Sequence, residues 1–348
     1  MSFKHGLKFL AGTVAGALVF SGCSALLPEE KEPTTTSASP EVPAYVSDWP
    51  GLPNLAYAPL SGELVDPSTI TSSALSAKVD NQPQARPQWG ISRADIVWEE
   101  QVEGGLTRLV AMWHSDVPKK IGPVRSIRPM DPDIISPVGG IVAYSGGKQK
   151  YVRMMQNTPV RNAIHGYGSL SDIIYRDNTR PAPHNVQVDA QELIAKYPKI
   201  KPPAQQFAYA FDVEGSTAFI DGKPAKELKL RYSSYRYPSY KYDAKTQTYL
   251  RLQEGKADYD AAKVRNSATN IVVIRVKITM DGNVPKTELL GSGKGYILTG
   301  GKAVAITWSK SSKTAPIVYK DAKGLIVRLA PGTTWVHPVP TAGTVSFS

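Results

Sequence analysis

The stretch "ADIVWEEQVEGGLTRLVAMWHS", residues 94–115, predicts a β-hairpin made of two long strands. Apolar and polar residues alternate on both sides of Gly104 and Gly105. A Gly-Gly pair supplies the positive φ angles that a two-residue hairpin turn requires. Such a turn sets Glu103 opposite Leu106 and thereby fixes the register of both strands.

The predicted register divides the hairpin into an apolar face and a charged face. On the apolar face the facing pairs are Ile96 with Trp113, Trp98 with Ala111, and Val102 with Thr107. The other face carries Glu99, Gln101, Glu103 and Arg108. We expect the apolar face to pack in a core. On the charged face, Arg108 stands across from Gln101 and reaches both glutamates diagonally.

A short segment after the hairpin, "IGPVRSIRPMD" at 121–131, holds two arginines between two prolines. Pro123 and Pro129 fix φ and push the residues before them toward extended geometry, so the segment is expected to be stiff. In an extended run Arg125 and Arg128 point to opposite sides. A single helical turn would instead put both on one face, as a fork for a carboxylate or phosphate.

These charged residues, together with the proline-stiffened loop "RDNTRPAPHN" at 176–185, suggest a ligand site. The candidate ligand-binding residues are Arg108, Arg125, Arg128, Arg176, Arg180 and Asn185. The candidate acid or base residues for catalysis are Asp80, Glu99, Glu103 and His184, with Asp131 nearby in sequence. The alternative is that the arginines and carboxylates pair with one another as structural ion pairs.

Several other chemistries lack support in the sequence. The histidines are scattered, and no zinc, EF-hand, G-x-S-x-G or Walker spacing occurs. We expect no metal and no cofactor; a carboxylate-bound calcium or magnesium ion is the one alternative. The formal charge of +11 suits an anionic wall polymer or lipid head groups, although surplus lysines also keep a surface soluble. A nucleic-acid partner is not expected.

Residues 1–23 are typical of a bacterial lipoprotein signal peptide. Lys4 and Lys8 precede an apolar run, and Ser21 and Gly22 precede Cys23, which is the only cysteine in the chain. Lipidation of Cys23 would anchor the protein at the extracytoplasmic face of the membrane. Cleavage would lower the formal charge from +11 to +9. The alternative is an ordinary signal peptide with a coincidental cysteine.

The rest of the chain divides by composition. Residues 24–56 are rich in Pro, Ser, Thr and Glu and predict a disordered tether. Residues 57–202 predict a mixed α/β domain, with a strand in "GGIVAYSGG" and helices in "KQKYVRMMQN", "LSDIIYRDN" and "DAQELIAKYP". Residues 203–348 alternate in tyrosine-rich strands and glycine turns, which predicts a mostly antiparallel β domain. The predicted fold class is α+β.

Several motifs in this order resemble the YerB-like lipoprotein family of bacteria. They are "KVDNQPQARPQWGISRADIVWE", "VEGGLTRLVAMWHS", "IGPVRSIRP", "RDNTRPAPHN", "GSGKGYILTGGKAVAITW" and "PGTTWVHPVP". The resemblance spans roughly residues 59–345 and implies an anchored lipoprotein with paired N- and C-terminal domains of unknown function. It implies no activity and assigns no catalytic residues.

The leading hypothesis from the sequence is a lipid-anchored envelope protein. It would bind an anionic or polyhydroxylated ligand, or an envelope protein, through an arginine-rich, carboxylate-lined pocket. The rival hypothesis is a hydrolase of cell-wall glycan that uses paired carboxylates. A third is a structural tether that binds no small ligand.

Overall fold

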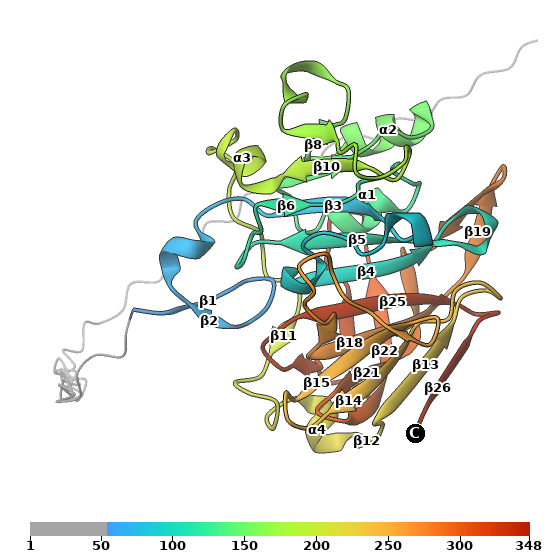
Figure 1. Ribbon diagram of the computed structural model, residues 1–348. Coiled ribbons are helices and arrows are strands. Elements are labelled where there is room, and N and C mark those ends of the chain that lie inside the picture. Colours follow the sequence, from blue (N-terminus) through green and yellow to red (C-terminus); the bar gives the residue numbers. More distant parts are fainter. Residues whose placement is uncertain (1–53) are drawn as a thin grey trace, which may run out of the picture. The chain divides into compact units, whose positions relative to one another are not determined.

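The computed structural model of the protein describes residues 54–348 (Figure 1). The predicted signal peptide, Cys23 and nearly all of the predicted tether lie outside the described residues. Among the helices of residues 54–348, none combines the length and apolar character needed to cross a membrane.

An eleven-stranded sheet is the central element of the fold. Its order is β12 (Lys223–Pro224), β22 (Lys302–Lys310), β21 (Gly291–Thr299), β18 (Asn270–Val276), β25 (Thr334–Pro340), β4 (Ile96–Gln101), β5 (Thr107–Trp113), β3 (Leu75–Asp80), β7 (Ile141–Tyr144) and β8 (Arg161–Ile164), with β23 (Val318–Lys320) beside β22. The parallel pairing of β25 with β4 joins strands from both parts of the chain, because Val336 stands next to Trp98. The two predicted halves therefore share one sheet.

Smaller sheets and short helices cover the central sheet. A six-stranded sheet contains β16 (Lys256–Ala257), β15 (Thr248–Gln253), β14 (Ser239–Asp243), β13 (Glu227–Arg231) and β26 (Thr344–Phe347), with β17 (Ser267–Ala268) beside β15. A three-stranded sheet contains β6 (Lys120–Ile121), β10 (Val186–Asp189) and β9 (Ile174–Arg176). Two-stranded pairs are β1 (Ala56–Tyr57) with β2 (Leu64–Val65), β11 (Ala208–Tyr209) with β24 (Arg328–Leu329), and β19 (Ile278–Asp281) with β20 (Val284–Thr287). The helices are α1 (Asp131–Ile135), α2 (Gln149–Gln156), α3 (Ala190–Ala195) and α4 (Thr217–Asp221).

Both faces of the β4–β5 hairpin are buried. On the first face, Trp98 and Val110 pack with apolar residues of α1 and α2. On the second face, Val97 and Ala111 pack with apolar residues of the three-stranded and six-stranded sheets. The protein is thus mostly β and contains several sheets, a character that was predicted only for residues 203–348, and the hairpin has no solvent-facing side.

The predicted register of the hairpin is wrong by one residue. Trp98 pairs with Val110 rather than Ala111, and Arg108 stands opposite Glu100 rather than Gln101. The connection is longer than two residues, because a 3-10 turn at Glu103–Gly105 lies inside a loop closed by the Val102 N–H donating to the Leu106 carbonyl at 2.8 Å. The shift moves Arg108 to the face opposite Glu99.

One further expectation needs correction. The stretch "LSDIIYRDN" is not a helix: it contains strand β9, which pairs with β10 and buries Ile174. Most strand pairs of the β-rich part are antiparallel, and β18 and β25 are parallel neighbours within it. Strand β7 and helices α2 and α3 lie where they were predicted, and the β14–β15 and β21–β22 hairpins lie in the part predicted to be β-rich.

Candidate functional site

Three arginines meet near the end of the β3–β5 ladder, and we call Arg108, Arg125 and Arg128 the arginine cluster. Arg108 extends from β5. The other two lie on the segment after β6, which forms neither a helical turn nor a strand at either arginine. This segment runs beside the end of β3: the Asp80 N–H donates to the Pro123 carbonyl at 2.8 Å, and the Arg125 N–H donates to the Lys78 carbonyl at 2.7 Å. These backbone hydrogen bonds hold the segment at Arg125 against β3.

Two of the arginines are paired with predicted candidate residues. Arg125 Nε lies 3.1 Å from Asp80 Oδ2, and Arg128 Nε donates to Glu103 Oε2 at 2.7 Å. His184 Nδ1 lies 2.7 Å from the same Asp80 oxygen. Burial pushes the pKa of Glu103 up, but the hydrogen bond and charge of Arg128 outweigh it and leave the pKa lowered. The side chains of Arg125 and His184 are 19% and 12% exposed, so the cluster reaches the surface.

Arg108 has no ion-pair partner within residues 54–348. Its side chain is almost buried, one Nη donates to the Ser126 carbonyl at 2.8 Å, and its Nε has no hydrogen-bond partner. Burial and the neighbouring charges of Arg128 and Arg125 lower the pKa of Arg108 to about 10. A buried cation held beside two other cations is an attractive position for an anion.

A second group of charges lies beneath the cluster, and the sequence reasoning missed two of its three members. Lys78, Glu100 and Asp131 are fully buried. Lys78 contacts Glu100 and donates to Asp131 Oδ1 at 2.7 Å, while Asp131 Oδ2 accepts the Arg128 N–H at 2.5 Å. Burial lowers the pKa of Lys78 to about 8. The correct hairpin register would have revealed Glu100, because it stands opposite Arg108.

Glu99 does not belong to the arginine cluster. It is fully buried on the second face of the hairpin, where Arg251 donates to its Oε2 at 2.7 Å and the Thr107 hydroxyl donates to its Oε1 at 2.8 Å. The Tyr232 hydroxyl also donates to its backbone carbonyl at 2.7 Å. These contacts fix Glu99 between the central and six-stranded sheets, away from solvent.

The predicted residues of the 176–185 loop mostly hold the loop in place. Arg176 donates to Asn185 Oδ1 at 2.7 Å, and Arg180 donates to the carbonyls of Ala85 and Pro87, both at 2.6 Å. Of this loop, only His184 forms a hydrogen bond or ion pair with the charged residues around the cluster. Residues 54–348 contain no group of three or more His, Cys, Asp or Glu side chains placed to hold a metal ion.

These observations define a class of protein that is mostly β, in which two parts of the chain build one sheet with a partly buried arginine cluster near the end of two of its strands. Residues 60–202 match the "Protein of unknown function (DUF3048) N-terminal domain", and residues 228–336 match the corresponding C-terminal domain. The chain belongs to the YerB-like family that pairs these two domains.

One similar protein is "Putative lipoprotein YerB" of Bacillus subtilis (strain 168). It is 28% identical over 305 residues, which cover 84% of this chain and 88% of the relative. The crystal structure of YerB protein from Bacillus subtilis has the same fold, with a TM-score of 0.72 and 23% identity, covering 84% of this chain and 99% of that one.

Proposed function

We propose that this protein is a lipid-anchored component of the cell envelope whose arginine cluster binds an anionic group of a ligand or partner. The anchor is Cys23, and the location is the extracytoplasmic face of the membrane. The lipoprotein-type signal sequence and the name of the Bacillus subtilis relative support the anchor. The partner is an anionic wall polymer, a glycan bearing acidic groups or an envelope protein.

The observation that carries the proposal is the unpaired state of Arg108. The carboxylates around it already have cationic partners: Asp80 has Arg125, Glu103 has Arg128, and the two deeper carboxylates share Lys78. A purely structural network would be expected to pair its most buried guanidinium. A carboxylate or phosphate arriving beside Arg108 would offset both its desolvation and the repulsion from the other two arginines.

Arg108→Met separates ligand binding from a structural role. We expect this variant to unfold at the same temperature as the unchanged protein or a higher one, because a buried, unpaired charge is removed. We also expect it to lose binding of inorganic phosphate and citrate measured by calorimetric titration. A loss of about 3–5 kcal/mol in stability, as for a broken internal ion pair, would contradict the proposal and favour a structural tether.

Arg125→Gln is the second variant, because Arg125 is partly exposed and lies at the surface of the cluster. It should weaken phosphate or citrate binding about tenfold or more, equivalent to about 1.4 kcal/mol. Arg93→Gln is the matched control, since Arg93 forms an exposed ion pair with Asp116. Equal binding of phosphate or citrate by the Arg125→Gln and Arg93→Gln proteins would show that Arg125 is not part of the site.

The anchor has its own test. Cys23→Ala should release the protein from the membrane fraction into the soluble fraction of the envelope. Unchanged membrane retention of the Cys23→Ala protein would contradict the lipid anchor, while leaving the arginine cluster unaffected as a binding site.

A hydrolase remains a second candidate because of one contact. Asp80 holds His184 Nδ1 at 2.7 Å, an arrangement that orients an imidazole for proton transfer at its other nitrogen. His184→Gln should then abolish release of soluble fragments from purified cell wall while leaving phosphate binding in place. No release by the unchanged protein would remove this candidate.

A further inference from the structure

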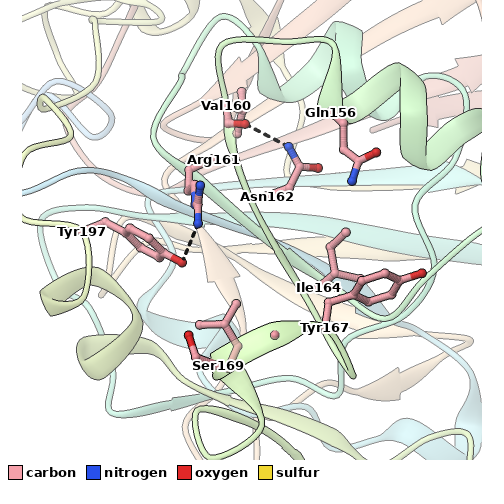
Figure 2. A pocket seen from close by; sticks show the side chains of 10 residues that line it. Gln156, Val160, Arg161, Asn162, Ile164, Tyr167, Ser169 and Tyr197 are labelled. Atoms are coloured by element: carbon pink, nitrogen blue, oxygen red, sulfur yellow. Dashed lines mark hydrogen bonds between the residues drawn. The ribbon is translucent and has the colours of Figure 1, made fainter.

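A hollow lies beside β8, outside the arginine cluster. Its volume is about 460 Å³, within the range of about 300–1,000 Å³ typical of small-molecule sites. It is formed by the end of α2, by β8, by the loop after it, and by Tyr197 (Figure 2). No carboxylate or lysine lines it, and Arg161 is its one charged side chain.

Two tyrosines lie on opposite sides of this hollow (Figure 2). Tyr167 is 60% exposed, so its ring is accessible to a ligand. Tyr197 is held by Arg161, whose guanidinium carbon lies 4.6 Å from the ring centre and whose Nη donates to the tyrosine hydroxyl at 3.2 Å. The ring of Tyr197 is therefore fixed in place, and the ring of Tyr167 is available for stacking.

Some polar side chains around the hollow already form hydrogen bonds within the protein, and others do not. The Asn162 amide is fixed, because it donates to the Val160 carbonyl at 2.9 Å and accepts from the Tyr144 hydroxyl at 2.8 Å. The side chains of Gln156 and Ser169 are exposed and form no hydrogen bond within residues 54–348. They can therefore donate to a ligand and accept from it without breaking an existing bond.

We propose that this hollow binds a sugar unit of an uncharged, polyhydroxylated glycan. A pyranose ring has an apolar face that stacks on an exposed tyrosine and a rim of hydroxyls that both donate and accept hydrogen bonds. Tyr167 supplies the stacking face, and Gln156 and Ser169 supply the hydrogen bonds. Arg161 is occupied by Tyr197, so the site does not depend on an anionic ligand.

The position of the hollow supports binding of one unit in a longer glycan. β8 is the last strand of the central sheet, so the hollow lies at an edge of the sheet rather than in the interior. Its lining residues come from exposed turns as well as from the strand. An extended peptide paired with the free edge of β8 is the competing occupant, and the test below includes it.

The experiment titrates the full chain with tetra-N-acetylchitotetraose and with maltotetraose by saturation-transfer NMR and calorimetry. We expect saturable binding of at least one oligosaccharide, weakened about tenfold by Tyr167→Ala, equivalent to about 1.4 kcal/mol. Gln156→Ala should weaken it by a smaller factor. The matched control is Tyr57→Ala, because Tyr57 is 56% exposed but does not line the hollow.

Three results would overturn the assignment: no saturable binding of either sugar, equal binding by the Tyr167→Ala and Tyr57→Ala proteins, or displacement of the sugar by an unstructured alanine-rich peptide that binds more tightly. Arg125→Gln should leave sugar binding unchanged. Failure of the anion site and failure of the sugar site are therefore distinguishable in the same set of proteins.

Discussion

Replacing Arg251 with methionine should destabilise the protein far more than replacing its partner Glu99 with glutamine. Arg251 is 1% exposed and donates to Glu99 Oε2 at 2.7 Å and to Asp258 Oδ2 at 2.5 Å. Its guanidinium carbon also lies 4.7 Å from the ring centre of Trp335. One cation thus neutralises two buried carboxylates, one on the central sheet and one next to the six-stranded sheet.

The asymmetry follows from the charge that each variant leaves behind. Without Arg251, Glu99 and Asp258 remain buried with no cation between them, which costs about 3–5 kcal/mol. With Glu99→Gln, Arg251 keeps Asp258 and the amide still accepts from Thr107, so the cost is about 1–2 kcal/mol. Burial, the larger cause of the lowered pKa of His337, persists in the Arg251→Met variant and opposes a compensating positive charge there.

Urea denaturation at pH 7, followed by tryptophan fluorescence, measures both free energies of unfolding. The double variant carrying Glu99→Gln and Arg251→Met should be more stable than Arg251→Met alone, since it leaves one buried carboxylate instead of two. Arg93→Met is the control, because its ion pair is exposed and is expected to contribute less than about 1 kcal/mol. A smaller loss for Arg251→Met than for Glu99→Gln would refute the reasoning.

Three further predictions concern stability. Burial raises the pKa of Asp95 from 3.8 to about 6. The protonated Asp95 carboxyl therefore contributes its full stability below pH 3.8, and this contribution is lost as pH rises through about 6. Stability should fall by up to about 3 kcal/mol over that window, and Asp95→Asn should flatten this part of a urea-denaturation pH series. Gly140→Ala should cost about 1–3 kcal/mol more than Gly139→Ala by thermal denaturation, because both have φ near +70° but only at Gly140 would the added carbon lie 2.2 Å from the Ala74 carbonyl oxygen. Lys78→Met should cost about 3–5 kcal/mol in urea, because it leaves two buried carboxylates without their cation; a loss below about 1 kcal/mol would contradict the pairing.

The existence of the hairpin could be predicted from the sequence, but its register could not. Both turn glycines have positive φ, as the Gly-Gly pattern predicts. The turn conformation also depends on a distant contact, since the Ser233 hydroxyl donates to the Gly105 carbonyl at 2.6 Å. A residue 128 positions away therefore contacts the turn, and local turn rules contain no information about it.

The error in the hairpin register also explains why only part of the candidate site could be predicted from the sequence. Arg125, Asp80 and His184 were all named from sequence and do lie together. Glu99 was placed beside Arg108 because the register was shifted, whereas its true partner, Arg251, is 152 positions away in sequence. Alternation along a strand predicts that neighbouring residues face opposite sides, but a shift of one residue exchanges the two sides.

The adjacent residues Glu99 and Glu100 show how one strand serves two purposes. Glu99 points to the second face, where Arg251 and its other donors satisfy its carboxylate, so its contacts join two sheets and leave nothing for a ligand. Glu100 points to the first face and contacts Lys78, the cation that it shares with a second buried carboxylate. That sharing leaves Arg108, directly opposite Glu100, without an anion of its own. The lack of a carboxylate partner for Arg108 is thus a consequence of how the protein distributes its own carboxylates between the two faces of β4.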